Sequence, residues 1–253
     1  MRKLFQKEWH GIPFKDFVVT SSSCLPDLQF YKSFYSCFLS KYHDWGDLDP
    51  EWVKLKLETA GLLESQFKAE KNTKILSLSC GLGVIEKELV RKGYSNLSIT
   101  ETLIEPLAWI RKYVPQENIF IGFFPDCLPK NYTYDIIYLA GAEYFLDQDE
   151  LILLLKEAKS RLSDGGRCIL VSWSFEPATF LNKMMSIAKY FLKYFFQVLH
   201  IKDRGQFWGY SRNQSDFHNA FVEAGFNIKE DGVLKKDTQW DTYWISAKIK
   251  KGI

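Results

Sequence analysis

Two closely spaced glycines, Gly81 and Gly83, follow a short apolar run in the segment KILSLSCGLGVIEKEL, residues 74–89. Glycine lets a backbone approach a ligand closely and adopt positive φ angles without the steric cost of a Cβ atom. A helical pattern begins directly after this turn, and the amides at a helix N-terminus favour anionic groups. The segment therefore predicts a turn that holds a nucleotide-like ligand against its backbone.

Glu101 is a second candidate, because it follows the next predicted strand. It lies 18 positions after Gly83, close to the separation of about 20 at which dinucleotide-binding folds place an acid that bonds a ribose hydroxyl. A carboxylate accepts hydrogen bonds from both ribose hydroxyls, and charge-assisted hydrogen bonds are the stronger kind. The alternative is an acid that favours the start of the following helix through the helix dipole. The strand, the turn and the spacing together favour ribose binding.

A sheet must position these residues, and the middle of the chain alternates between strand and helix patterns. This alternation predicts crossover connections and a mostly parallel sheet, which binds ligands at the carboxyl ends of its strands. The predicted strands cover residues 74–79, 96–100, 118–123, 134–141, 167–173, 226–234 and 242–249. The predicted helices among them cover residues 83–93, 103–113, 148–166 and 214–225. No helix separates the last two strands, so we expect them to form an antiparallel pair at the sheet edge.

The N-terminal region differs in pattern from the sheet region. Residues 1 to about 25 carry no periodic pattern and are predicted to be irregular. Two helices are predicted after them, over 28–42 and 50–68. Asp27 and Asp49 stand where helix N-caps are expected, and a proline follows Asp49 at the first helical position.

A long amphipathic helix is predicted over 178–199, with three lysines opposite its apolar stripe, and a loop follows to residue 212. Such a helix caps a core or pairs with a second copy of the chain. The alternative is that it lies on a membrane surface. We therefore predict an N-terminal helical cap over 1–70 and a second domain over 71–253, with a helical insertion around 176–212.

Composition excludes some classes of partner. The net charge is +2, from 33 basic and 31 acidic residues, which does not indicate a nucleic-acid binder. The five cysteines form no CxxC pair or Cys/His cluster, so neither a disulfide framework nor a metal site is predicted, and reduced cysteines suit a cytoplasmic protein. No apolar run reaches about 18 residues, so no transmembrane helix is expected. A monomer and a homodimer both remain open.

Residues 74 to about 175 resemble the class I methyltransferases that use S-adenosylmethionine. ILSLSCGLGVIEKEL resembles their first motif, usually an acid and then Gly-x-Gly-x-Gly, and LSITETLIEPLAWIRK resembles the second, with Glu101 as the ribose acid. GFFPDCLPKNYTYDIIYLAGAEYFLD resembles the stretch that closes over adenine, and LLKEAKSRLSDGGRCILVSW the helix, double-glycine turn and fifth strand. The resemblance implies an α/β, Rossmann-like sheet of seven mostly parallel strands, with an antiparallel last strand and helices on both faces. It also implies methyl transfer from S-adenosylmethionine, with S-adenosylhomocysteine as the product.

The first motif departs from the family at two positions. Ser77 stands where an acid commonly positions the methionine amino group, and it brings a hydroxyl but no charge. Ser79 replaces the first glycine, which a serine can do if its φ stays negative. Phe123 or Phe124 is expected to stack on adenine, and Asp126 to contact its amino group. The resemblance assigns cofactor binding to Ser77, Ser79, Cys80, Gly81, Gly83, Glu101, Thr102, Phe124, Asp126, Cys127, Ala140 and Gly141.

Catalytic candidates follow the fourth strand of the sheet, where Glu143 and Tyr144 lie at the expected mouth of the site. Many relatives have a histidine near this position as a possible base, whereas this chain has Phe145, so the motif assigns no general base. His200, in the predicted loop, is the remaining candidate.

Acceptor contacts are expected from the first helix and from the loop before residue 212. The candidates are Tyr31, Tyr35, Trp208, Tyr210 and Arg212. The segment QFWGYSR resembles methyltransferase-like proteins of bacterial surface-sugar gene clusters, which implies a sugar or another small polar acceptor.

Two alternatives remain. A methyltransferase-like fold that has lost catalysis would serve as a binding or scaffold protein, which the two serines and the missing base favour. A nicotinamide-dependent oxidoreductase would share the glycine turn and the ribose acid.

Overall fold

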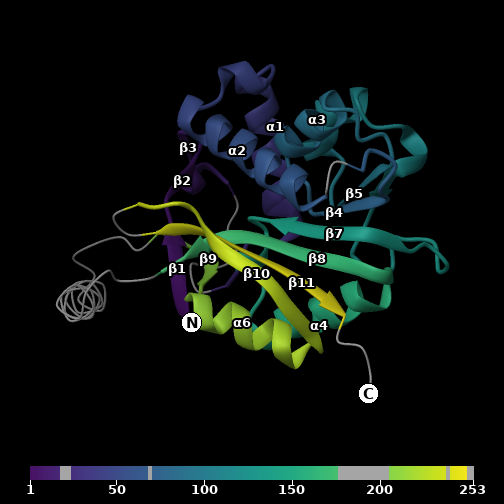
Figure 1. Cartoon of the computed structure of the whole chain (residues 1–253). Helices are drawn as coiled ribbons and strands as arrows, with labels where there is room; N and C mark the ends of the chain where they lie inside the picture. Colours follow the sequence, from purple (N-terminus) through teal and green to yellow (C-terminus); the bar gives the residue numbers. More distant parts are fainter. Residues whose placement is uncertain (18–23, 68–69, 176–204, 238–239, 250–253) are drawn as a thin grey trace.

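The computed structural model describes residues 1–17, 24–67, 70–175, 205–237 and 240–249, and its centre is a seven-stranded sheet (Figure 1). The strand order is β10-β11-β8-β7-β4-β5-β6. Strands β4 to β8 run parallel, and β11 pairs antiparallel with both β8 and β10. The bounds are β4 Ile75–Leu78, β5 Leu97–Glu101, β6 Ile119–Ile121, β7 Tyr134–Ala140, β8 Leu162–Ser174, β10 Phe226–Lys235 and β11 Asp241–Ile249. The predicted α/β class, with seven mostly parallel strands and a reversed last strand, is confirmed.

Helices cover both faces of the sheet because its central strands are apolar on both sides (Figure 1). Side chains alternate between the two faces of a strand. Along β7, Ile136 and Tyr138 belong to the apolar cluster that contains residues of α1, α2 and α3, whereas Ile137 and Leu139 belong to the cluster of α4 and α6. The bounds are α1 Leu28–Lys41, α2 Pro50–Gln66, α3 Val84–Arg91, α4 Gln148–Ser160 and α6 Gln214–Glu223.

The two N-terminal helices begin where their capping residues predict. The Asp27 carboxylate accepts a hydrogen bond from the N–H of Phe30 at 2.8 Å, and Asp49 caps α2 in the same way. The α1 side chains Phe30, Phe34 and Phe38 are buried in the cluster that continues into the sheet. These helices therefore share their core with the sheet, and the division into two domains remains a prediction.

Two segments that were predicted to be irregular contain strands. β1 (Arg2–Gln6) pairs antiparallel with β9 (Gln206–Ser211), which lies in the predicted loop. β2 (Glu8–Trp9) and β3 (Ile12–Pro13) form a short hairpin. The prediction was wrong because strand formation depends on the partner strand, and the partner of β1 lies at the other end of the chain.

The predicted helix over 103–113 is replaced by two 3₁₀ turns, η3 (Glu105–Ala108) and η4 (Ile110–Lys112). The buried residues Leu107 and Ile110 are three positions apart, which is the period of a 3₁₀ turn. The described residues also form the 3₁₀ turns η1 Phe14–Asp16, η2 Trp45–Asp47, η5 Gln116–Asn118 and η6 Glu143–Phe145.

The predicted helix over 178–199 and the candidate His200 lie outside the described residues. The helical insertion and its two alternatives, a cap or dimer helix and a membrane-surface helix, therefore stay predictions. Within the described ranges, no helix combines the length and the apolar character that crossing a membrane requires.

Candidate functional site

A cavity of about 630 Å³ lies at the carboxyl ends of β4, β5 and β7. The chain continues from β4 to β5 and β6 on one side and then to β7 on the other, so the strand order reverses beside β4. Open parallel sheets bind ligands at such a reversal, in the crevice beyond the strand ends. The volume also falls in the range of about 300–1,000 Å³ that is usual for small-molecule sites. The cavity is therefore the candidate functional site.

The glycine turn after β4 lines this cavity in a left-handed backbone conformation. The φ angles are 56° at Gly81 and 72° at Gly83. A Cβ atom at Gly83 would lie 2.4 Å from the Ile110 Cβ atom, so the turn requires glycine there. Ser79 has a φ of 54°, which corrects the expectation of a negative angle. It adopts this conformation at a steric cost, and its N–H donates to the Thr100 hydroxyl at 3.1 Å.

Glu101 joins the end of β5 to the glycine turn. Its Oε2 accepts a hydrogen bond from the Gly81 N–H at 2.9 Å, and its Oε1 accepts from the N–H and the hydroxyl of Thr102 at 2.9 and 3.2 Å. Burial raises the pKa of Glu101, and these hydrogen bonds oppose that shift. The carboxylate lines the cavity and retains acceptor capacity, since an ionised carboxylate offers about four lone-pair positions. Ribose binding at Glu101 stays a prediction that this geometry permits.

Most residues predicted to bind the cofactor lie together in the cavity lining, namely Ser77, Ser79, Cys80, Gly81, Gly83, Glu101, Thr102, Phe124, Ala140 and Gly141. The other two do not line it. Asp126 is exposed. The Cβ atom of Cys127 lies 3.2 Å from the point where a Cβ atom on Gly122 would stand. Of the three candidates for adenine contact, Phe123 and Phe124 line the cavity and Asp126 does not.

Glu86, on α3, lines the cavity and was missed by the sequence analysis. It is 2% exposed, and its Oε1 accepts hydrogen bonds from the hydroxyls of Ser77 and Tyr138, each at 2.6 Å. Burial raises the pKa of Glu86. One signal was present in the sequence, because Glu86 lies four positions after Leu82 and three before Leu89, on the apolar side of its helix.

Lys56, on α2, is the second missed residue. It lines both this cavity and a smaller one of about 120 Å³ beside it. Its Nζ lies 3.4 Å from the carbonyl oxygen of Ala140 and 5.5 Å from the centre of the Trp52 ring. Burial lowers the pKa of Lys56, while the carboxyl groups of Glu86 and Glu143 oppose that shift. A lysine in this setting can pair with an anion or, in its neutral form, accept a proton.

Aromatic side chains from three elements line another part of the cavity. Tyr31 and Tyr35 come from α1, Tyr144 from η6 and Trp208 from β9. The Trp208 ring stacks on Phe14 with a centroid distance of 4.5 Å. Burial raises the pKa of Tyr31, Tyr35 and Tyr144, so these phenols stay protonated at neutral pH and are available as hydrogen-bond donors.

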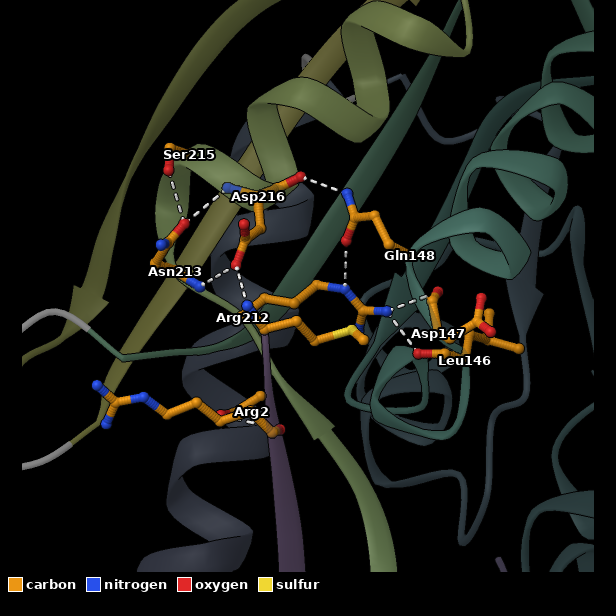
Figure 2. A network of polar contacts seen from close by, with 10 residues as sticks. Arg2, Leu146, Asp147, Gln148, Arg212, Asn213, Ser215 and Asp216 are labelled. Atoms are coloured by element: carbon orange, nitrogen blue, oxygen red, sulfur yellow. Dashed lines mark hydrogen bonds and ion pairs between the residues drawn. The ribbon is translucent and has the colours of Figure 1, made fainter. Parts of the chain in front are cut away.

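Arg212 was predicted to face the acceptor, but it does not line the cavity and is only 2% exposed. Its guanidinium donates to the backbone carbonyls of Leu146 and Asp147 and to the side chain of Gln148, at 2.5 to 3.0 Å (Figure 2). It also donates to the carbonyl of Glu143 at 3.1 Å. These groups lie on η6 and at the start of α4. Arg212 therefore holds the segment after β7 in place.

Two further candidates also lie outside the cavity lining. Tyr210 is on β9, where its ring packs against Phe207 at 5.3 Å. Glu143 is buried, and its Oε1 accepts a hydrogen bond from the Ser172 hydroxyl. Of the catalytic candidates in the described residues, only Tyr144 lines the cavity.

Comparison with solved structures agrees with this architecture. The chain superimposes on magnesium protoporphyrin IX methyltransferase from Synechocystis PCC 6803 with bound SAH at a TM-score of 0.59 and 14% identity, covering 86% of this chain and 94% of that one. An S-adenosylmethionine-dependent methyltransferase from Clostridium acetobutylicum ATCC 824 gives a TM-score of 0.52 and 15% identity, with 87% and 99% covered. The glycopeptide N-methyltransferase MtfA gives 0.54 and 12%, with 77% and 90% covered.

No protein-family model matches the sequence. No curated protein sequence matches it either. The strand order, the position of the cavity and the structural matches agree with one another. The chain therefore has the fold of the class I S-adenosylmethionine-dependent methyltransferases.

Proposed function

We propose that this protein is a methyltransferase that uses S-adenosylmethionine and acts on a small polar acceptor containing a ring. The observation that carries the proposal is the cavity itself, in which the glycine turn and Glu101 meet at the reversal point of the sheet. Similar folds crystallised with SAM and SAH bound support the same cofactor here.

The residues around the cavity fit this cofactor chemically. Glu101 offers a carboxylate for the ribose, the turn from Ser79 to Gly83 offers backbone close to the ligand, and Phe124 offers an aromatic face for adenine. The cofactor supplies a methyl group already activated on a sulfonium. The protein then has to orient the acceptor and exclude water. The aromatic side chains that line the cavity, here called the aromatic wall, suit this task; they are Tyr31, Tyr35, Tyr144 and Trp208.

The chemical class of the acceptor is inferred from the side chains of the aromatic wall. Flat aromatic faces suit a ring, and protonated phenols suit hydroxyl or carbonyl oxygens. A sugar or sugar-derived metabolite is the first candidate, consistent with the QFWGYSR segment that supplies Trp208. Two proteins of similar fold are named as methyltransferases of a magnesium porphyrin and of a glycopeptide. An aromatic ring is therefore the second candidate for the acceptor.

Isothermal titration calorimetry with S-adenosylmethionine, S-adenosylhomocysteine and NAD tests the function. We expect both S-adenosyl compounds to bind and NAD not to bind. Glu101→Ala should weaken S-adenosylhomocysteine binding about 10- to 100-fold, the range expected for a lost charge-assisted hydrogen bond. Glu117→Ala, at an exposed glutamate on η5, is the matched control and should change nothing.

Each alternative has its own result. Absence of binding by either S-adenosyl compound up to millimolar concentration would refute the methyltransferase, and NAD binding alone would indicate an oxidoreductase. Tight cofactor binding without methyl transfer to any acceptor in a panel of sugars and aromatic metabolites would favour a binding or scaffold protein. An unchanged affinity in Glu101→Ala would refute the ribose assignment.

A further inference from the structure

Glu86 is a buried carboxyl group whose two oxygens have different surroundings. Oε1 accepts hydrogen bonds from Ser77, at the end of β4, and from Tyr138 on β7, each at 2.6 Å. Oε2 is buried and has no hydrogen-bond donor among the described residues. The carboxyl group is thus held firmly on one side and left without a partner on the other, at a residue that lines the cavity.

A buried carboxylate oxygen without a partner destabilises the folded protein unless a positive group reaches it. A buried charge without a partner destabilises a protein strongly, so buried carboxylates are normally paired. The Lys56 ammonium attracts Glu86, but no ion pair joins the two within 4 Å. Among the described residues that line the cavity, three acids, Asp27, Glu86 and Glu101, face the single base Lys56. The cavity is therefore short of positive charge and suits a ligand that carries it.

We propose that Glu86 receives the ammonium group of the methionine part of S-adenosylmethionine, with Ser77 and Tyr138 as the residues that position its carboxylate. This inference rests on the proposed function. It also accounts for Ser77, which has no charge of its own but donates its hydroxyl to Glu86. The anionic group stands on helix α3 behind the strand end, rather than on the strand itself.

A series of three ligands tests this assignment. S-adenosylmethionine carries both an ammonium and a sulfonium, S-adenosylhomocysteine carries only the ammonium, and 5′-methylthioadenosine carries neither. Glu86→Gln preserves the shape of the side chain and removes its charge. We expect this variant to bind the first two ligands about 10- to 100-fold more weakly and to bind 5′-methylthioadenosine as the wild type does, measured by calorimetry.

The matched control is Glu88→Gln on the same helix, where the glutamate pairs with Arg91 at the surface and does not line the cavity. It should change none of the three affinities. Ser77→Ala, which removes one of the two donors to Glu86, should weaken S-adenosylmethionine and S-adenosylhomocysteine by a smaller factor and leave 5′-methylthioadenosine unchanged.

The outcomes separate the assignment from the proposed function. Equal loss for all three ligands in Glu86→Gln would show a structural role and overturn the assignment, as would unchanged affinity for S-adenosylhomocysteine. Weakened S-adenosylmethionine with unchanged S-adenosylhomocysteine would place the carboxylate at the sulfonium instead. If the wild type binds none of the three, the proposed function itself fails.

Discussion

Around the glycine turn, different residues provide the close packing and the hydrogen bonds that a regular first motif would provide together. Gly83 provides the close packing against Ile110, and Glu101 holds the Gly81 amide. Ser79 occupies a left-handed conformation that favours glycine, with a φ of 54°. An L-residue there costs roughly 1–2 kcal/mol, which the surrounding hydrogen bonds must offset.

Ser79→Gly should therefore increase the free energy of unfolding by about 0.5–1 kcal/mol, because relief of the strain exceeds the extra freedom of glycine in the unfolded chain. Chemical denaturation measures this change. Ser79→Ala is the matched control and should give no gain, since alanine carries the same strain. A Ser79→Gly variant no more stable than Ser79→Ala would contradict the strained conformation.

Elements far apart in the sequence build the aromatic wall. Strand β9 brings Trp208 to the cavity, and it is held on one side by its pairing with β1. At Gly209 a Cβ atom would lie 2.2 Å from the carbonyl oxygen of Tyr144, so β9 and η6 are in close backbone contact. Arg212, directly after β9, completes this junction through its hydrogen bonds to η6 and α4 (Figure 2).

Arg212→Met should lower the free energy of unfolding by about 2–4 kcal/mol, because it removes the hydrogen bonds that a buried guanidinium donates to the segment after β7. Arg91→Met is the matched control at an exposed arginine that pairs with Glu88, and it should cost under about 1 kcal/mol. Urea denaturation compares the two variants. Equal stability of both would show that the Arg212 network contributes little.

At the scale of the whole molecule, carboxyl groups that favour ligand binding lower the stability of the ligand-free protein. Glu86 and Glu143 are buried and Glu101 is partly buried, all in or beside the cavity, and removal from water raises the pKa of each carboxyl group. A carboxyl group with a raised pKa binds its proton more tightly in the folded state. It therefore contributes stability below the ordinary pKa of 4.5, and this contribution is lost as the pH rises through the folded pKa. Ionised carboxylates that suit a cationic ligand thus destabilise the ligand-free protein.

Glu86→Gln tests this conflict, because glutamine has no proton to lose. Relative to the wild type, the unfolding free energy of Glu86→Gln should rise as the pH increases from 4.5 to 8. Glu88→Gln should follow the opposite trend weakly, since the hydrogen bond from Arg91 lowers the pKa of that partly buried glutamate. Thermal denaturation across this pH range measures both, and parallel curves for Glu86→Gln and the wild type would refute the argument.

The amino-acid sequence by itself determined the sheet and the position of the site along it. Short apolar runs mark β4 and β7 as strands buried on both faces, and the glycines of the turn and the spacing to Glu101 are local features. Such features depend on residues close together in the chain. They are sufficient to predict the α/β class, the terminal antiparallel pair and the part of the cavity lining that the glycine turn and Glu101 form.

Only the tertiary structure decided which distant side chains complete the site. Glu86 and Lys56 lie in helical segments that carry several other charged residues, and the pattern does not show which carboxylate will meet Ser77 and Tyr138. The sequence does not indicate that Arg212 is buried. Its burial against η6 depends on the pairing of β9 with β1. The physical reason is that burial and pairing depend on contacts between remote elements, whereas periodicity records only the immediate neighbours of each residue.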